Sequence, residues 1–95
     1  MKIEWDDRKA RSNEKKHGIS FWEASFVFHD RLFVVFEDPD HSQTENRYII
    51  IGHSDENRLL IAGYVERDDA VRLIWARKPN RRERRIYEEK LKQQW

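Results

Sequence analysis

The stretch RYIIIGHSDENRLLIAGYVERDDAVRLIWAR, residues 47–77, decides the fold expected for this chain. It contains three runs rich in β-branched and aromatic residues, at 47–52, 59–66 and 71–77, and such runs are typical of strands. The connections at 55–57 and 67–69 are short enough only for hairpins, so we expect antiparallel pairing. A fourth such run, Leu32–Glu37, comes before them and is followed by turn-forming residues, Asp38, Pro39, Asp40, His41 and Ser42. The centre of the chain therefore predicts a four-stranded antiparallel meander.

The N-terminal side of this meander reads as one strand and one helix. Lys2–Trp5 alternates polar and apolar residues, which predicts a short first strand. Asp6 or Asp7 offers an N-cap for a polar helix over residues 9–16, and Gly18 supplies its C-terminal stop.

Two further helices begin with capping pairs. Ser20 and Glu23 have capping-box spacing, in which each side chain bonds the other's backbone N–H, at the start of a helix that ends near Asp30. Asn80 and Glu83, after Pro79, open the final helix in the same way. The resulting order predicts a two-layer α+β fold. Its antiparallel sheet has four to five strands, and the two N-terminal helices and one C-terminal helix cover one face.

Length and composition limit the class of protein. The 95 residues fit one domain over 1–95, and with Cys at 0 there is no disulfide framework. Aromatic residues make up 13 % of the chain, which argues against disorder. No apolar run approaches a membrane span, and acids follow the first residues at once, so we expect no signal peptide and a cytoplasmic location.

The net charge of +1 conceals an uneven distribution. Residues 77–92 hold eight bases and three acids, a net charge of +5, while the rest of the chain carries −4. A basic segment in a nearly neutral protein indicates an anionic partner.

Cations gather where the last strands and the final helix meet. On that helix, the spacing puts Arg81, Arg84, Arg85 and Glu88 on one side, and Ile86, Tyr87 and Leu91 on another side that packs on the sheet. One interpretation is a solvated helix face, with Glu83 paired to Tyr87 and Arg84 paired to Glu88. The concentration of charge favours the other, an anion-binding surface.

RNA is the natural anion for a small basic face of this kind. Metal-free RNA cleavage needs a base for the 2′-hydroxyl proton, cations for the phosphate, and an acid for the leaving oxygen. Glu66 is a candidate base, and Arg67, Arg72 and Arg77 are candidate phosphate clamps because guanidinium forks bond phosphate twice. Lys16 or His17 would supply a further proton or charge.

Other chemistry-bearing residues are read as structural. The four histidines lack the i, i+4 spacing of a helical metal pair, and without Cys a structural zinc site is not expected. His29, His41 and His53 fall near turns and are read as solvated, and Trp5 and Trp22 as core. Trp75, in the last strand, is expected to pack in the core as well, but it would stack a base if it faced the arginines. No metal and no cofactor is predicted.

Motifs along nearly the whole chain resemble the BrnT family of small ribonuclease toxins. They are Ile3-Glu4-Trp5-Asp6, Asn13 with Lys16-His17-Gly18, Ser20-Phe21 with Ala24, Glu37-Asp38-Pro39-Asp40-His41-Ser42, Arg47 with Ile51-Gly52, Glu66-Arg67, Arg72-Leu73-Ile74, Ala76-Arg77-Lys78, and Arg81-Arg82-Glu83-Arg84-Arg85 with Tyr87-Glu88. Two departures are Trp75, where a small residue is common, and Pro79-Asn80, where Ala-Thr is more usual.

The resemblance implies a RelE-like fold and a metal-independent endoribonuclease toxin of a type II toxin–antitoxin system. A BrnA-like ribbon-helix-helix antitoxin would bind it in a hetero-oligomer, which would contact operator DNA only through the antitoxin. Positions that match the family motifs make Lys16, His17, Glu66, Arg67 and Arg77 the candidate catalytic residues. The expected RNA-binding residues are Arg72, Lys78, Arg81, Arg82, Arg84, Arg85 and Tyr87.

Two alternatives stay open from the sequence. One is a non-catalytic module that holds RNA or an acidic protein through the basic C-terminal segment. The other is an interaction subunit whose charges only complement a partner.

Overall fold

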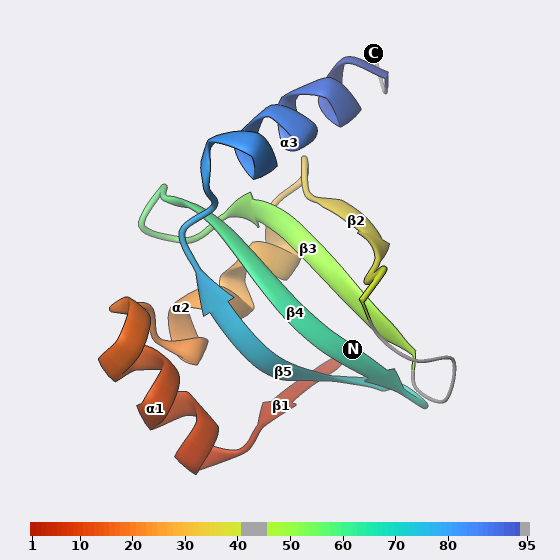
Figure 1. The fold of residues 1–95 in the computed structure, drawn as a ribbon. Coiled ribbons are helices and arrows are strands. Elements are labelled where there is room, and N and C mark those ends of the chain that lie inside the picture. Colours follow the sequence, from red (N-terminus) through yellow and green to blue (C-terminus); the bar gives the residue numbers. More distant parts are fainter. Residues whose placement is uncertain (41–45, 94–95) are drawn as a thin grey trace.

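The computed structural model describes residues 1–40 and 46–93 of the chain. The elements in chain order are β1 (Lys2–Trp5), α1 (Asp7–His17), α2 (Phe21–Ser25), the 3-10 helix η1 (Phe26–His29), β2 (Val34–Glu37), β3 (Arg47–His53), β4 (Leu59–Arg67), β5 (Ala70–Arg77) and α3 (Arg81–Gln93) (Figure 1). The predicted order of strands and helices is confirmed. His41 and Ser42 of the predicted turn lie outside the described residues.

The five strands form one sheet in the order β1-β5-β4-β3-β2. Strands β2 to β5 pair antiparallel with their neighbours, so the predicted meander is confirmed. β1 pairs parallel with the first half of β5, from Lys2 opposite Ala70 to Trp5 opposite Leu73, which makes the sheet mixed. The register of β4 and β5 shifts between Gly63 and Tyr64, and this bulge leaves Ile74 as an extra residue in β5.

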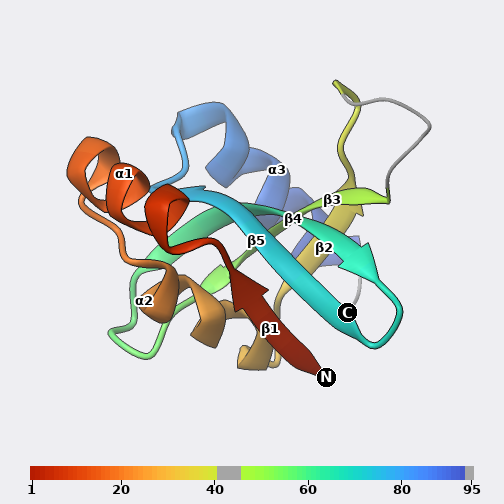
Figure 2. The ribbon, with the colours of Figure 1, turned by 90° about the horizontal axis from the view of Figure 1, so that it is seen from below.

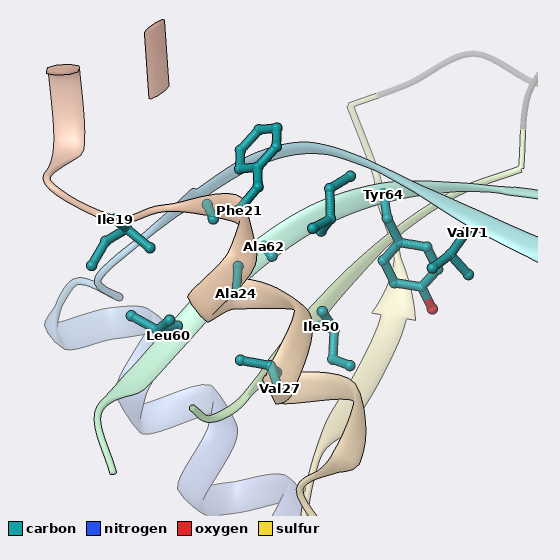
Figure 3. Packing of buried hydrophobic residues seen from close by; sticks show 11 residues of the cluster. Ile19, Phe21, Ala24, Val27, Ile50, Leu60, Ala62, Tyr64 and Val71 are labelled. Atoms are coloured by element: carbon teal, nitrogen blue, oxygen red, sulfur yellow. The ribbon is translucent and has the colours of Figure 1, made fainter. Parts of the chain in front are cut away.

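The helices cover both faces of the sheet, so the expected two-layer arrangement is wrong for α3. Figure 2 shows α2 and α3 on opposite sides of the strands. Successive strand residues point to opposite faces, and both faces of the central strands are apolar, so both must be covered. Ile50, Leu60 and Ala62 pack under α2 with Phe21 and other buried residues (Figure 3), whereas Ile51 and Ile61 pack with Tyr87 of α3.

Helix α1 runs beside the half of β5 that β1 does not reach. Asp6 caps its start by accepting a hydrogen bond from Lys9 N, and Gly18 ends it in the left-handed conformation, at φ 72°. At this point the side chain of Asn13 makes the hydrogen bonds to β5 that a neighbouring strand would otherwise make. Its amide Nδ2 donates to the Ala76 carbonyl at 2.8 Å and its Oδ1 accepts from Ala76 N at 3.1 Å. Nδ2 also donates to the Ile19 carbonyl at 3.0 Å, which fixes the chain between α1 and α2.

The capping prediction for α2 holds in one half only. Ser20 Oγ accepts from Glu23 N at 3.0 Å, but the Glu23 carboxylate turns inward, to the Ser54 hydroxyl at 2.6 Å and to the Arg58 guanidinium. The helix is short and continues as η1. Trp22 therefore falls on the outer side and is 66 % exposed, so its assignment to the core is wrong.

The capping pair of α3 is complete. Asn80 Oδ1 accepts from Glu83 N at 2.8 Å, and Glu83 Oε1 accepts from Asn80 N at 2.9 Å. Over the described ranges, 1–40 and 46–93, no helix is long and apolar enough to cross a membrane.

Candidate functional site

Four arginines from three strands project from the same face of the sheet, the face on which α3 packs. Arg47 of β3 and Arg72 of β5 both lie opposite Val65 of β4, and Arg67 follows two residues after Val65. Strand alternation places these side chains, with Arg77, on the side of Ile61. We call Arg47, Arg67, Arg72, Trp75 and Arg77 the basic face. Its cations come from residues far apart in the sequence.

Trp75 occupies the centre of the basic face. Gly63 lies opposite it in β4, and a Cβ built on Gly63 would be 2.3 Å from the Trp75 Nε1 atom, so the indole lies directly over the glycine backbone. The Arg77 guanidinium carbon is 5.2 Å from the Trp75 ring centre, within cation–π range. The sequence made Trp75 a stacking candidate on the condition that it faces an arginine. That condition is met.

Glu83 fixes the orientation of the Arg77 guanidinium. Its two carboxylate oxygens accept from Arg77 Nη1 at 2.7 Å and Nη2 at 2.9 Å. The Arg77 hydrogen bonds hold the pKa of Glu83 below its ordinary value, and the same bonds raise the pKa of Arg77. This pair replaces the expected contact between Glu83 and Tyr87, and it ties the end of β5 to the start of α3.

Lys16 and His17, at the end of α1, lie near Trp75 of β5. They line a cavity of about 270 Å³ between α1 and β5, together with Lys9, Ser12, Asn13, Ile74 and Trp75. The bonds from Asn13 to Ala76 hold the end of α1 against β5 at this point. The structure therefore places two of the five candidate catalytic residues, Lys16 and His17, in one cavity with Trp75, and a third, Arg77, over the Trp75 ring.

Glu66 and Arg67 lie at the opposite end of the strands. Glu66 is paired with Val71 whereas Arg77 is paired with Ile61, and five residues of β4 correspond to about 17 Å. Glu66 also points to the α2 face, where burial of the ring and, to a smaller extent, the charge of Glu66 raise the pKa of Tyr64 to about 12. Glu66 and Arg77, named above as candidate base and candidate clamp, therefore do not lie at one site, because the nine residues of β4 separate them. Arg67 remains on the basic face.

The cations of α3 are exposed at Arg81, Arg82, Arg84 and Arg85, and Lys78 is exposed before the helix. Arg82 lines a groove that faces the sheet, and with Arg85 and Lys90 it also lines a second hollow along the helix. Tyr87 is 4 % exposed and packs on Val34, Ile51 and Ile61. Its assignment as an RNA-binding residue is wrong, since it lies on the inward side of α3.

Arg72 is paired within the protein. Its Nη1 donates to Glu4 Oε2 of β1 at 3.0 Å, and both side chains are about one-third exposed. An ion pair that is open to solvent contributes little to stability, so the guanidinium can exchange this partner for a phosphate at small cost.

Sequence reasoning missed two polar clusters at the end of the sheet where β5 finishes. His53, read as a solvated turn residue, donates its backbone N–H to Asp30 Oδ2 at 2.7 Å, and its ring lies edge-on to Tyr87. Glu23, Asp55 and Glu56 offer carboxylate oxygens within 4.8 Å of one another. Glu23 already accepts from Ser54 and Arg58, so this trio is explained by an internal ion pair.

Comparison with known proteins supports the family resemblance. The crystal structure of the Brucella abortus ribonuclease toxin BrnT is similar, with a TM-score of 0.67 and 24 % sequence identity over 85 % of this chain and 99 % of that one. A comparison with curated proteins finds no match. The model of the family described as the ribonuclease toxin BrnT of type II toxin–antitoxin systems matches residues 5–83, from the end of β1 to the first turn of α3. The chain therefore belongs to the BrnT family of ribonuclease toxins.

Proposed function

We propose that this toxin is an endoribonuclease that cleaves RNA without a metal ion beside Trp75. The observation that carries the proposal is the placement of Lys16 and His17 in one cavity with Trp75. The ring of Trp75 also makes a cation–π contact with Arg77. A proton-transferring group, cations and a stacking surface thus meet at one point of a chain that belongs to a ribonuclease toxin family.

The chemistry assigned to these residues is an internal transesterification. The 2′-hydroxyl oxygen attacks the adjacent phosphorus as it loses its proton, and the bond to the 5′-oxygen breaks, which leaves a 2′,3′-cyclic phosphate and a 5′-hydroxyl. His17 exchanges protons with the reacting oxygens, since imidazole is the side chain suited to this near neutral pH. Arg77 and Lys16 stabilise the charge that builds on the phosphate.

Metal independence is supported by the kinds of side chain around Trp75. Lys9, Lys16 and Arg77 are cationic and would repel a divalent ion, whereas Mg²⁺ and Ca²⁺ sites are built from oxygen ligands. Glu66, the candidate base, lies at the other end of the strands. His17 therefore takes the proton of the 2′-hydroxyl in its place.

The partners follow from the family. A type II toxin has an antitoxin partner; we propose that here it is a BrnA-like ribbon-helix-helix protein in a hetero-oligomer that reaches operator DNA only through the antitoxin. RNA and such a partner are both met in the cytoplasm.

The proposal is tested by expressing and purifying the toxin and following cleavage of a fluorescent RNA in EDTA. Wild-type protein is expected to cleave. His17→Asn is expected to be slower by about 10²–10⁴-fold. Arg77→Lys, in which one ammonium cannot keep both hydrogen bonds to Glu83 and also contact the phosphate, is expected to be slower by about 10²-fold. Glu66→Gln is the control and keeps wild-type activity.

Three outcomes contradict parts of the proposal. Cleavage that stops in EDTA overturns metal independence, and full activity of His17→Asn and Arg77→Lys removes the site beside Trp75. RNA binding without cleavage, in a preparation free of antitoxin, favours the non-catalytic binding module.

A further inference from the structure

A groove of about 280 Å³ runs between α3 and the sheet, next to the basic face. Its apolar lining comes from Phe36, Ile49 and Ile61 of the sheet and Ile86 of the helix, and Pro39, Asp40 and Glu83 also line it. Arg82 and Asn80 stand at its rim. Asn80 Oδ1 is engaged by Glu83 N, and across residues 1–40 and 46–93 its amide nitrogen has no protein acceptor. The groove thus offers apolar walls, a free amide donor and a cation, together with two carboxylates, of which Glu83 is already bonded to Arg77.

The groove lies on the sheet next to Arg77 and Trp75, and it shares no lining residue with the cavity that holds Lys16 and His17. Ile49, Gly63 and Trp75 lie opposite one another on three adjacent strands, and Ile61 lies opposite Arg77. The only residue between Ile49 and Trp75 has no side chain, so nothing rises between the groove and the indole. Adjacent strands are about 5 Å apart, which puts the groove one or two strand spacings from Arg77 and Trp75.

This combination suits a nucleobase better than the other ligands of a basic face. A phosphate would gain nothing from Phe36 and three isoleucines, whereas a base is flat, apolar on its faces and polar at its edge. The Asn80 amide can donate to an acceptor on that edge. The neighbouring Arg77 and Arg82 suit the phosphates that a nucleotide carries on either side.

We propose that this groove is a base-binding subsite, which takes one base of single-stranded RNA while the phosphate next to it lies at Arg77. The proposal rests on the proposed ribonuclease function and adds where the substrate is read. The toxin would then prefer RNA segments that are unpaired, because a base in a duplex cannot enter the slot.

The experiment uses the full chain, labelled with ¹⁵N and at the isoleucine δ1 methyl groups, and a 2′-O-methyl trinucleotide, which lacks the reactive hydroxyl and cannot be cleaved. On titration, the methyl signals of Ile49, Ile61 and Ile86 are expected to shift through the ring current of the base. Ile19 and Ile50, buried under α2, are the internal controls and stay in place. The same trinucleotide with an abasic site is expected to move Arg and Trp75 signals but not these methyl groups.

A pair of variants gives a second measurement. Ile86→Trp fills the groove and is expected to weaken trinucleotide binding by about 5- to 150-fold, the equivalent of the roughly 1–3 kcal/mol that base stacking contributes. Glu88→Trp adds the same side chain on the exposed side of α3 and leaves the affinity unchanged.

The outcomes separate this inference from the proposed function. Shifts at Arg and Trp75 signals without shifts at the three methyl groups overturn the subsite and leave RNA binding intact. An absence of any shift contradicts both. If an apolar peptide of the antitoxin moves the three methyl signals and the trinucleotide does not, the groove is a protein interface and the subsite is overturned.

Discussion

Trp75 is held by neighbours on both sides of its ring. The Gly63 backbone lies beneath the indole, and the Arg77 guanidinium lies over it. Any side chain at position 63 must therefore move the ring that the proposed site is built around.

The variant Gly63→Ala tests this contact. The new Cβ would overlap the indole at 2.3 Å, so we expect a loss of about 1–3 kcal/mol of stability and a changed near-ultraviolet circular dichroism signal. In a Trp75→Ser background the same change has room, and its effect on urea unfolding should nearly vanish. Equal effects in both backgrounds would contradict the contact.

Glu23 is a buried carboxylate whose charge is stabilised by a partner. Hydrogen bonds from Arg58, with a smaller contribution from Ser54, hold its pKa below the ordinary value of 4.5 although burial acts in the opposite direction. The unfolded chain therefore binds a proton at a higher pH than the folded protein. The pair's contribution to stability is present above about pH 4.5 and is lost as the pH falls through the lowered pKa.

The variant Glu23→Gln is expected to be less stable than wild type at pH 7 and to have a flatter dependence of stability on pH below about 4.5. Thermal unfolding over a pH series measures both. Glu88→Gln, exposed on α3, is the control with the wild-type pH profile. If the stability of Glu23→Gln falls as steeply as that of wild type at low pH, other carboxylates cause the loss of stability in acid.

At the scale of elements, one side chain joins α1 to the sheet. Asn13 is 7 % exposed and makes three hydrogen bonds, two of them to Ala76 in the part of β5 that β1 leaves open. It therefore also determines where Lys16 and His17 lie relative to Trp75.

We expect Asn13→Ala to lower the free energy of unfolding by roughly 2–4 kcal/mol, because it leaves backbone groups of Ala76 and Ile19 buried without partners. Ser12→Ala, one residue away on the exposed side, should change it by less than about 0.5 kcal/mol. Urea unfolding measures both. A loss below about 1 kcal/mol for Asn13→Ala would mean that water replaces these bonds.

Local sequence signals predicted the elements well where the cause was local. The caps at Asp6, Ser20 and Asn80, the stop at Gly18 and the hairpin connections all act between residues a few positions apart. The inward turn of Glu23 was not predicted, because its partners Ser54 and Arg58 are more than thirty residues away.

At the scale of the whole molecule, the basic surface formed on folding differs from the basic segment of the sequence. The sequence placed the anion-binding surface on the C-terminal segment, where the net charge is +5. The structure places three further arginines, Arg47, Arg67 and Arg72, on the same face of the sheet as Arg77, toward the other end of the strands. Arg81, Arg84 and Arg85 lie on the exposed helix instead.

Salt dependence of RNA binding distinguishes the two surfaces. If the basic face contacts phosphates, Arg47→Gln should reduce the slope of log K against log salt by about 0.7, the value for one single-strand phosphate contact. Arg85→Gln, which removes the same charge from α3, should leave the slope nearly unchanged. A reduced slope for Arg85→Gln and an unchanged slope for Arg47→Gln would show that RNA binds α3 instead.

The sequence by itself determined the order of strands and helices, the meander, the caps and the family, because each depends on local patterning or on motifs in order. Only the tertiary structure decided that α3 covers the second face, that Glu66 lies far from Arg77, and that Tyr87 is buried. It also decided which arginines share a surface. The physical reason is that strand register and packing bring together residues from distant segments, and a sequence read along its length does not contain the bulge, the parallel β1 pairing or the crossing of α3 that set those positions.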